Sequence, residues 1–292
     1  MDLDLMKIVS RLKFVVFSII FISVGQPSIA STEMVHFSLP DLAPTAFQKK
    51  RAAAKGETAK AKKGQALQGT LHLPDATSVV PAVIVLVSGD GLRPSHNAWG
   101  QWLAENGYAA LVIDSYGSRG VQSYADNSVV PMSADAFAAH KFLSSLPNIN
   151  SARISLMGFS YGATHTIMAV EKDNRYRPAN ISFNAAISIY PRCQGATIVT
   201  APVLLLLGDA DPLLSVNSCL KMIEDASEAG MLLSHHIYAG ATHFFDNPDY
   251  SRAVHDANPD LAKPAWYSTN FYHPEYHQDA KRRVVEFLNL QK

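Results

Sequence analysis

The sequence predicts an α/β fold in which helices flank a doubly wound, mostly parallel sheet. Short apolar runs, such as 82–87 and 109–113, alternate with helical segments. Segments of about ten to fifteen residues in this alternation are typical of βαβ units, whose parallel strands are buried on both faces. The composition agrees, because 48% of the 292 residues are hydrophobic and 17% are charged, which allows a large core.

The elements follow in order from the hydrophobic pattern and the breakers. Strands are expected at 35–39, 65–73, 82–87, 109–114, 153–157, 185–190, 203–207 and 232–238. Asn97 is expected to cap a helix that ends at Asn106-Gly107, and Ser133 a helix that runs to Leu146. Further helices are expected at 163–171, 216–229 and 277–290. The composition does not change between residues 65 and 292, so we expect one domain there.

The first thirty residues resemble a signal peptide. Basic residues precede an apolar run over 14–24, and small residues at 28 and 30 fit a cleavage site before Ser31. A spanning helix needs about 20 apolar residues, so this run is short for one. We expect export to the periplasm or the medium without a stable membrane span, with a retained anchor as the alternative. Residues 31–64 then form an N-terminal extension, whose Ala- and Lys-rich part over 46–64 predicts an exposed loop or frayed helix.

Export affects the interpretation of the two cysteines. Cys193 follows an expected strand, and Cys219 lies in the helix after the next strand. An oxidising compartment favours a disulfide between them, and two buried thiols are the alternative.

Charge and histidine patterns exclude other function classes. Lys+Arg and Asp+Glu both number 25, so nothing indicates a nucleic acid partner. His235 and His236 are adjacent on an expected strand and face opposite ways, with no carboxylate at ligand spacing. We therefore expect no metal site at these histidines.

The chemistry centres on Gly158-Phe159-Ser160-Tyr161-Gly162, between an expected strand and an expected helix. Strand, Gly-x-Ser-x-Gly and helix form a nucleophile elbow. The turn strains the backbone of the serine and leaves no room for side chains two positions away, which explains both glycines. Ser160 is the expected nucleophile.

An acid and a base follow later strand ends. Parallel strands gather reactive groups at their carboxyl ends, where Asp209 and Asp211 follow one strand and His243 follows the next. Serine needs a base, and a carboxylate must orient that base. We expect His243 to be the base and Asp211 to orient it, because Pro212 rigidifies the Asp211 loop; Asp209 is the alternative. The order Ser, Asp, His is that of an α/β-hydrolase.

Backbone N–H groups should bind the oxyanion. Tyr161, directly after the nucleophile, supplies one, and the loop Ser88-Gly89-Asp90-Gly91 supplies the second through Asp90 or its glycine neighbours. The same loop also fits a tight turn.

Arg119 is a candidate contact for a substrate carboxylate and equally a solvated loop arginine. The aromatic residues of 246–276 either wall the pocket or pack the last helix onto the sheet.

These motifs together resemble the dienelactone hydrolase family over residues 65–290. The resemblance rests on Gly158 to Gly162, Gly208-x-x-Asp211, Tyr238 to Phe245, Leu103 to Tyr108 and Asp114 to Gly120. It implies an α/β-hydrolase fold, no metal or organic cofactor, and hydrolysis of esters or lactones. The founding enzymes carry a cysteine nucleophile, whereas this chain has Ser160, which favours a general serine esterase.

Three hypotheses follow from the sequence. The first is an exported serine hydrolase of small carboxylic esters or lactones. The second is an acyltransferase or peptidase on the same triad, and the third is a binding module that keeps the fold without catalysis. The three candidate side chains argue against the third.

Overall fold

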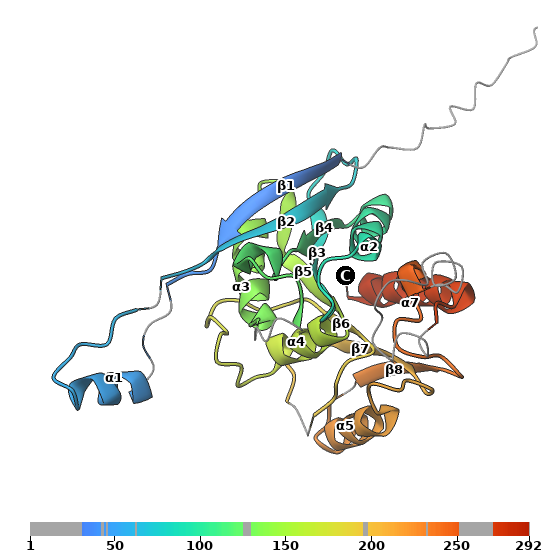
Figure 1. Ribbon diagram of the computed structural model, residues 1–292. Helices are drawn as coiled ribbons and strands as arrows, with labels where there is room; N and C mark the ends of the chain where they lie inside the picture. Colours follow the sequence, from blue (N-terminus) through green and yellow to red (C-terminus); the bar gives the residue numbers. More distant parts are fainter. Residues whose placement is uncertain are drawn as a thin grey trace, which may run out of the picture.

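The computed structural model describes residues 31–291 except 42–43, 45, 62, 125–129, 195–197, 232 and 251–270. The expected signal peptide, residues 1–30, lies outside the described residues. The described chain folds around one eight-stranded sheet in the order β1-β2-β4-β3-β5-β6-β7-β8 (Figure 1). This order reverses direction around β3 and β5, as a doubly wound sheet does.

The sheet is antiparallel at one edge and parallel elsewhere. β1 pairs with β2 and β2 with β4 in antiparallel fashion, and every later pair is parallel. The predicted α/β-hydrolase fold is confirmed. The strands are β1 (Ser31–Ser38), β2 (Ala66–Leu73), β3 (Val80–Leu86), β4 (Ala109–Ile113), β5 (Ile149–Phe159), β6 (Ala186–Ile189), β7 (Val203–Gly208) and β8 (Leu233–Tyr238).

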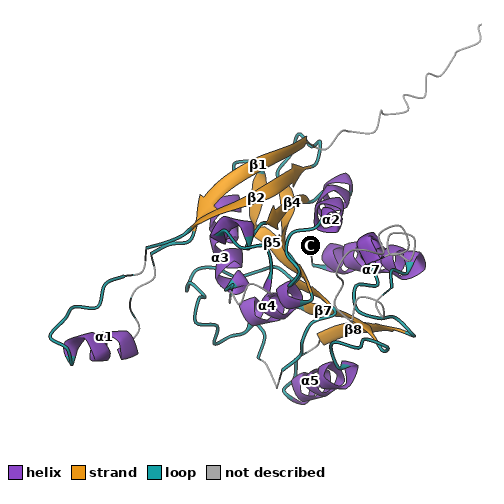
Figure 2. Ribbon diagram, viewed as in Figure 1, coloured by secondary structure: helices purple, strands orange, loops and turns teal. Residues whose placement is uncertain are grey.

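Helices cover both faces of the sheet (Figures 1 and 2). Two lie on one face and two on the other, while α5 packs against β8 near the far edge. The first pair is α2 (Pro94–Glu105) and α7 (Pro274–Leu290), the second is α3 (Met132–Leu143) and α4 (Tyr161–Val170), and α5 covers Val216–Glu228. The central strands β3, β4, β6 and β7 are almost completely buried, which explains why their sequences are apolar throughout instead of alternating.

Two expected N-caps lie inside their helices, and the last helix begins at Pro274, three residues before the expected start. α2 begins at Pro94, because proline suits the first helical turn and the His96 ring accepts the N–H of Arg93 at 2.9 Å. Asn97 therefore lies inside the helix instead of capping it. α3 begins at Met132, so Ser133 is also inside its helix.

The segment expected as an extension has two parts. β1 pairs along its full length with β2, so residues 31–38 belong to the sheet. The chain then leaves the body and forms α1 (Ala46–Ala53), in which no residue is buried, before it returns to β2 (Figure 1). This helix fits the expected frayed helix. Among the described residues, no helix is long and apolar enough to cross a bilayer.

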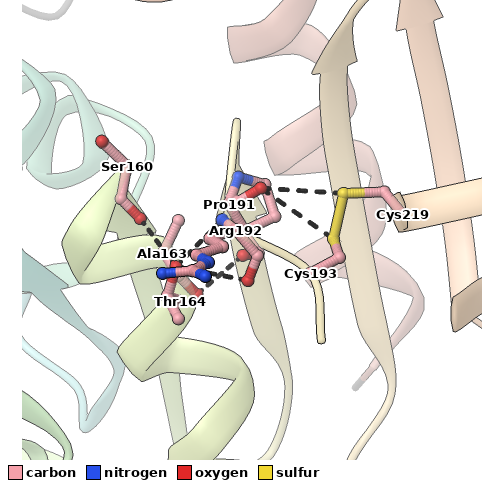
Figure 3. The surroundings of a disulfide bond; sticks show 8 residues. Ser160, Ala163, Thr164, Pro191, Arg192, Cys193 and Cys219 are labelled. Carbon is pink, nitrogen blue, oxygen red and sulfur yellow. Dashed lines mark hydrogen bonds between the residues drawn. A yellow bond between two sulfur atoms is a disulfide. The ribbon is translucent and has the colours of Figure 1, made fainter. Parts of the chain in front are cut away.

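A disulfide joins Cys193 and Cys219, whose Cα atoms lie 4.9 Å apart (Figure 3). Cys193 follows β6, and Cys219 lies in α5, which begins shortly after β7. The bond therefore ties the end of one central strand to the helix after the next. The carbonyl oxygen of Pro191 lies against both sulfurs, at 3.9 and 3.7 Å.

Replacing both Cys193 and Cys219 with alanine should lower the free energy of unfolding by about 3.5 kcal/mol, the chain-entropy value for a loop of 26 residues. Urea unfolding with and without reductant measures the difference. The double variant should not respond to reductant. Two free thiols per chain in the denatured, unreduced wild-type protein would contradict the bond.

Two buried histidines make the fold sensitive to acid. His96 lies behind the loop after β3, and His165 lies on α4, where its ring contacts Tyr161. Burial lowers the pKa of each to about 4. A histidine whose pKa is lower in the folded than in the unfolded state, where it is near 6.5, is protonated first in the unfolded chain. Stability is therefore full above about pH 6.5 and is lost as the pH falls towards 4.

Between pH 7 and pH 5 these two histidines should together reduce the free energy of unfolding by on the order of 4 kcal/mol. His96→Gln should remove the share of His96, about half of what these two histidines contribute to the slope; His277, whose pKa burial also lowers to about 4, keeps its own share. The variant should still fold, because glutamine at the third helical position can accept the N–H of Arg93. Urea titrations at several pH values measure the slope. The exposed His235→Gln is the control, and an unchanged slope in His96→Gln would contradict the assignment.

Candidate active site

Ser160 occupies a strained turn between β5 and α4. Its φ and ψ angles are 51° and −113°, and its N–H donates to the Ile189 carbonyl at 3.0 Å. A positive φ is costly for a residue with a side chain and persists only where the surroundings enforce it. The turn leaves Ser160 partly exposed at the carboxyl end of β5, above the start of α4.

The two glycines of the motif are required by backbone packing. A Cβ at Gly158 would lie 2.5 Å from the backbone of Gly162, and a Cβ at Gly162 would lie 2.4 Å from the Val87 carbonyl oxygen. Neither neighbour can move without opening the crossing of β5, α4 and β3. Close backbone packing therefore accounts for both glycines, as the sequence predicts.

Ser160, His243 and Asp211 form one hydrogen-bonded chain. His243 Nε2 lies 2.8 Å from Ser160 Oγ, and His243 Nδ1 lies 2.6 Å from Asp211 Oδ2. The carboxylate can only accept, so Nδ1 carries the proton and Nε2 is left to accept from the hydroxyl. The side chains of His243 and Asp211 are 1% and 4% exposed, so water barely competes for either bond.

The two aspartates after β7 have separate partners. The other oxygen of Asp211 accepts the N–H groups of Leu213 and Leu214 at 2.8 and 3.0 Å, which fixes the carboxylate in its loop. Asp209 does not contact His243. It accepts the N–H of Gly240 at 2.6 Å and so joins the loop of the acid to the loop of the histidine.

The loop after β3 lies beside the elbow. A Cβ built on Gly89 would be 3.5 Å from Tyr161 Cβ, and the N–H of Gly91 donates to the Ser88 carbonyl in the expected tight turn. The Asp90 carboxylate bonds neighbouring side chains instead of its own backbone. It accepts from the Ser88 hydroxyl, from Arg93 Nε at 3.0 Å and from the Tyr250 hydroxyl at 2.9 Å.

Neither alternative proposed for Arg119 describes its position. Its guanidinium forms a bidentate pair with Asp135, at 2.7 and 2.9 Å, and also donates to the Ser115 carbonyl. The Asp135 side chain is completely buried and that of Arg119 is 12% exposed. A buried carboxylate needs such a partner, so this guanidinium is already bound within the protein. The sequence alone did not predict this ion pair, because Asp135 lies in the next helix, 16 residues after Arg119.

The described part of the connection 246–276 packs against the His243 loop and β8. The Phe271 N–H donates to Thr242 Oγ1 at 2.9 Å, and the Tyr276 hydroxyl donates to the Ala239 carbonyl at 2.8 Å. The Tyr250 ring stacks on Phe244. These contacts favour packing of the last helix over a pocket wall, while Trp266 and Tyr267 lie outside the described residues. Of the two adjacent histidines on β8, His236 has its Nε2 atom 3.9 Å from Asp279 Oδ2 on α7.

Three connected residues near the His243 turn were not predicted. The Tyr190 ring lies against the His243 ring at 4.6 Å, and its hydroxyl donates to Asp246 at 2.6 Å. Trp99 Nε1 donates to the other oxygen of Asp246 at 2.8 Å. Backbone strain marks the same place, because the non-glycine positive φ values among the described residues are at Ser160, Tyr190 and Phe244. The one sequence signal for Asp246 was its place three residues after His243.

Comparison with known proteins shows which family the chain belongs to. The "probable 2-oxo-3-(5-oxofuran-2-ylidene)propanoate lactonase" of a Bradyrhizobium species is 24% identical over 245 residues, 76% of this chain and 94% of that protein. A candidate dienelactone hydrolase of Klebsiella pneumoniae has a similar structure, with a TM-score of 0.60 and 17% identity over 89% of this chain and 99% of that one.

An esterase of Thermogutta terrifontis, solved with propionate, has a TM-score of 0.54 at 16% identity, over 77% of this chain and 89% of that one. At these identities the two solved structures show the fold alone. The family model of the dienelactone hydrolases matches residues 67–291, which is most of the sequence and contains every residue of the site described above. The chain therefore belongs to the dienelactone hydrolase family, a family of carboxylic ester hydrolases.

Proposed function

We propose that the protein is an exported serine hydrolase that cleaves carboxylic esters or lactones through an acyl-enzyme. The observation that carries this proposal is the hydrogen-bonded chain from Ser160 through His243 to Asp211, with the serine held in a strained elbow. A hydroxyl, an imidazole and a carboxylate in this order can activate a weak nucleophile at neutral pH.

In the first half-reaction Ser160 Oγ attacks the substrate carbonyl carbon and its proton passes to His243 Nε2. The C–O bond to the leaving group then breaks, and the imidazolium returns the proton to the departing alkoxide. In the second half-reaction His243 takes a proton from water as the water attacks the acyl carbon, and Ser160 leaves with that proton. Asp211 keeps the proton on Nδ1 and stabilises the transient imidazolium.

The oxyanion of each tetrahedral intermediate needs backbone donors. The Tyr161 N–H begins α4 and has no carbonyl of its own helix to bind, and the positive helix end favours negative charge there. The Asp90 N–H lies on the loop beside the elbow. The Asp90 carboxylate is held by Arg93 and Tyr250, which supports the backbone N–H of Asp90 as the group offered to the substrate.

The family and the named activity of the Bradyrhizobium relative support esters and lactones as substrates. An ester needs one nucleophile and one proton carrier, and the described site supplies both. An amide has a poorer leaving group, so esters are the first substrates to test. We propose no metal or organic cofactor for this chemistry, because the triad and two backbone donors supply each step.

A fluorophosphonate probe should label wild-type protein on Ser160, and Ser160→Ala should abolish labelling and lower ester turnover by about 10⁴-fold or more. Peptide mass mapping locates the label, and p-nitrophenyl esters, matched amides and lactones measure turnover. Ser145→Ala, which removes an exposed hydroxyl, is the control.

Three results would contradict parts of the proposal. An unlabelled wild-type protein would favour a binding module. Faster turnover of the amides than of the matched esters would favour a peptidase, and acyl transfer to added alcohol in preference to water would favour an acyltransferase.

We also propose that residues 1–30 are removed during export and that Ser31 begins the mature chain. Two observations support this. β1 begins at Ser31, the first residue after the proposed cleavage site, and pairs along its length with β2. Both cysteines form one disulfide, which an oxidising compartment favours.

Expression of the full chain in a bacterial host should give exported protein whose N-terminal residue is Ser31. Intact mass and N-terminal sequencing of the periplasmic fraction measure this. Ala30→Trp should block cleavage, because the position before the cut requires a small residue. An intact N-terminus on wild-type protein in the membrane fraction would support an anchor instead.

A further inference from the structure

A second buried carboxylate lies close to the base, on the turn that carries it. Asp246 is 1% exposed and accepts hydrogen bonds at both oxygens, from Trp99 Nε1 at 2.8 Å and from the Tyr190 hydroxyl at 2.6 Å. Indole N–H can only donate. Burial, and then the Asp246 charge, raise the pKa of Tyr190 well above its usual value, so this hydroxyl also keeps its proton and donates. Two donors on its two oxygens favour the ionised carboxylate.

The two donors come from distant parts of the fold and are themselves fixed. Trp99 is a buried residue of α2, and its ring packs on Phe159 of β5 and on His277 of α7. Tyr190 follows β6 in a strained conformation, with a φ of 44°. Asp246 therefore ties the turn after β8 to two other parts of the core.

Tyr190 connects this carboxylate to the base. Its ring lies 4.6 Å from the His243 ring, and its hydroxyl is bound by Asp246. Asp211 binds His243 at the Nδ1 edge, whereas Tyr190 packs on the ring itself. The imidazole is thus held by one carboxylate directly and by the other through an aromatic ring.

Burial of the Asp246 carboxylate lowers the stability of the folded protein. Burial raises the pKa of Asp246, although the bonds from Tyr190 and Trp99 and the charged form of His243 oppose the rise. A carboxyl whose pKa is raised on folding destabilises the folded state at neutral pH. A buried charge that costs stability and lies beside a reacting group is a candidate for function.

We propose that Asp246 is a positioning residue for the reaction of Ser160: through Tyr190 it holds the His243 ring, and its negative charge favours the imidazolium that forms during attack. This inference rests on the proposed function. When the Ser160 proton reaches Nε2, His243 becomes positive while Nδ1 remains protonated. Asp211 and Asp246 then both face a cation, in a region where little water screens the charges. No proton moves to or from Asp246.

Other ionisable groups lie around Asp246 and Tyr190. They come from the loop after β3, the end of β6, the histidine turn, the segment before α7 and α7 itself: Asp90, Tyr190, His243, Tyr272, His277 and Lys281. The Lys281 ammonium lies over the Trp99 ring at 5.5 Å and makes no direct ion pair with Asp246. Asp246 thus remains a source of negative charge next to the base.

Asp246→Asn separates charge from hydrogen bonding. The amide oxygen still accepts from Trp99, and the amide NH₂ can donate to the Tyr190 hydroxyl oxygen, so both bonds are kept and the charge is lost. We expect kcat for p-nitrophenyl acetate to fall about 10-fold or more with little change in KM. The acid limb of the rate of fluorophosphonate labelling of Ser160 should move to lower pH by about half a unit or more, because the imidazolium loses support.

Tyr190→Phe is the second variant, because it keeps the ring and the Asp246 charge and cuts their connection. It should lower kcat severalfold at unchanged KM. Asp279→Asn is the control, since Asp279 also accepts a tyrosine hydroxyl, that of Tyr238 at 3.0 Å, but on α7 and without contact to His243. Urea unfolding should show Asp246→Asn folded and at least as stable as wild type at neutral pH.

Specific outcomes would overturn the inference or the proposed function. A folded Asp246→Asn within twofold of wild-type kcat and with the same acid limb overturns it. If Asp246→Asn does not fold, the Tyr190→Phe result decides, and activity within twofold of wild type again overturns it. Wild-type protein that neither hydrolyses esters nor reacts with the probe overturns the proposed function itself, so the two failures are distinguishable.

Discussion

The close crossing of β5, α4 and β3 is the constraint on which the site depends. Gly158 and Gly162 allow backbone atoms to approach so closely that a Cβ on either would meet backbone at 2.5 Å or less. That approach forces Ser160 to a positive φ and presents its hydroxyl at the end of β5. The large parallel core stabilises the strained turn, because opening it would expose central strands that are otherwise buried.

The histidine is positioned by contacts that converge from different elements. Asp211 binds it from the loop after β7, Asp209 binds the turn before it, and Tyr190 packs on its ring from the end of β6. The disulfide joins two of these regions, since Cys193 follows Tyr190 closely and Cys219 lies in the helix after the Asp211 loop. These contacts give the turn that carries His243 a single geometry, which the proposed role of His243 as a general base requires.

Sequence reasoning worked best where local chemistry is strict. Uninterrupted apolar runs identified the central strands, and the glycine pattern identified the elbow, because each depends on neighbours in the chain. Helix starts were less certain: at α2, Pro94 and the His96 ring replaced the expected Asn97 cap. The partner of Arg119 was missed for a related reason, since Asp135 comes to Arg119 only after α3 packs against the loop after β4.

The sequence by itself determined the fold class, the nucleophile motif, the order of serine, acid and base, and the family. These are encoded in local patterns and in the rule that parallel strands gather reactive groups at one edge. Tertiary structure decided which aspartate contacts His243, where Arg119 is held, and how Trp99, Tyr190 and Asp246 come together. Those contacts join residues as far as 147 positions apart, and no local pattern records which distant side chains will meet.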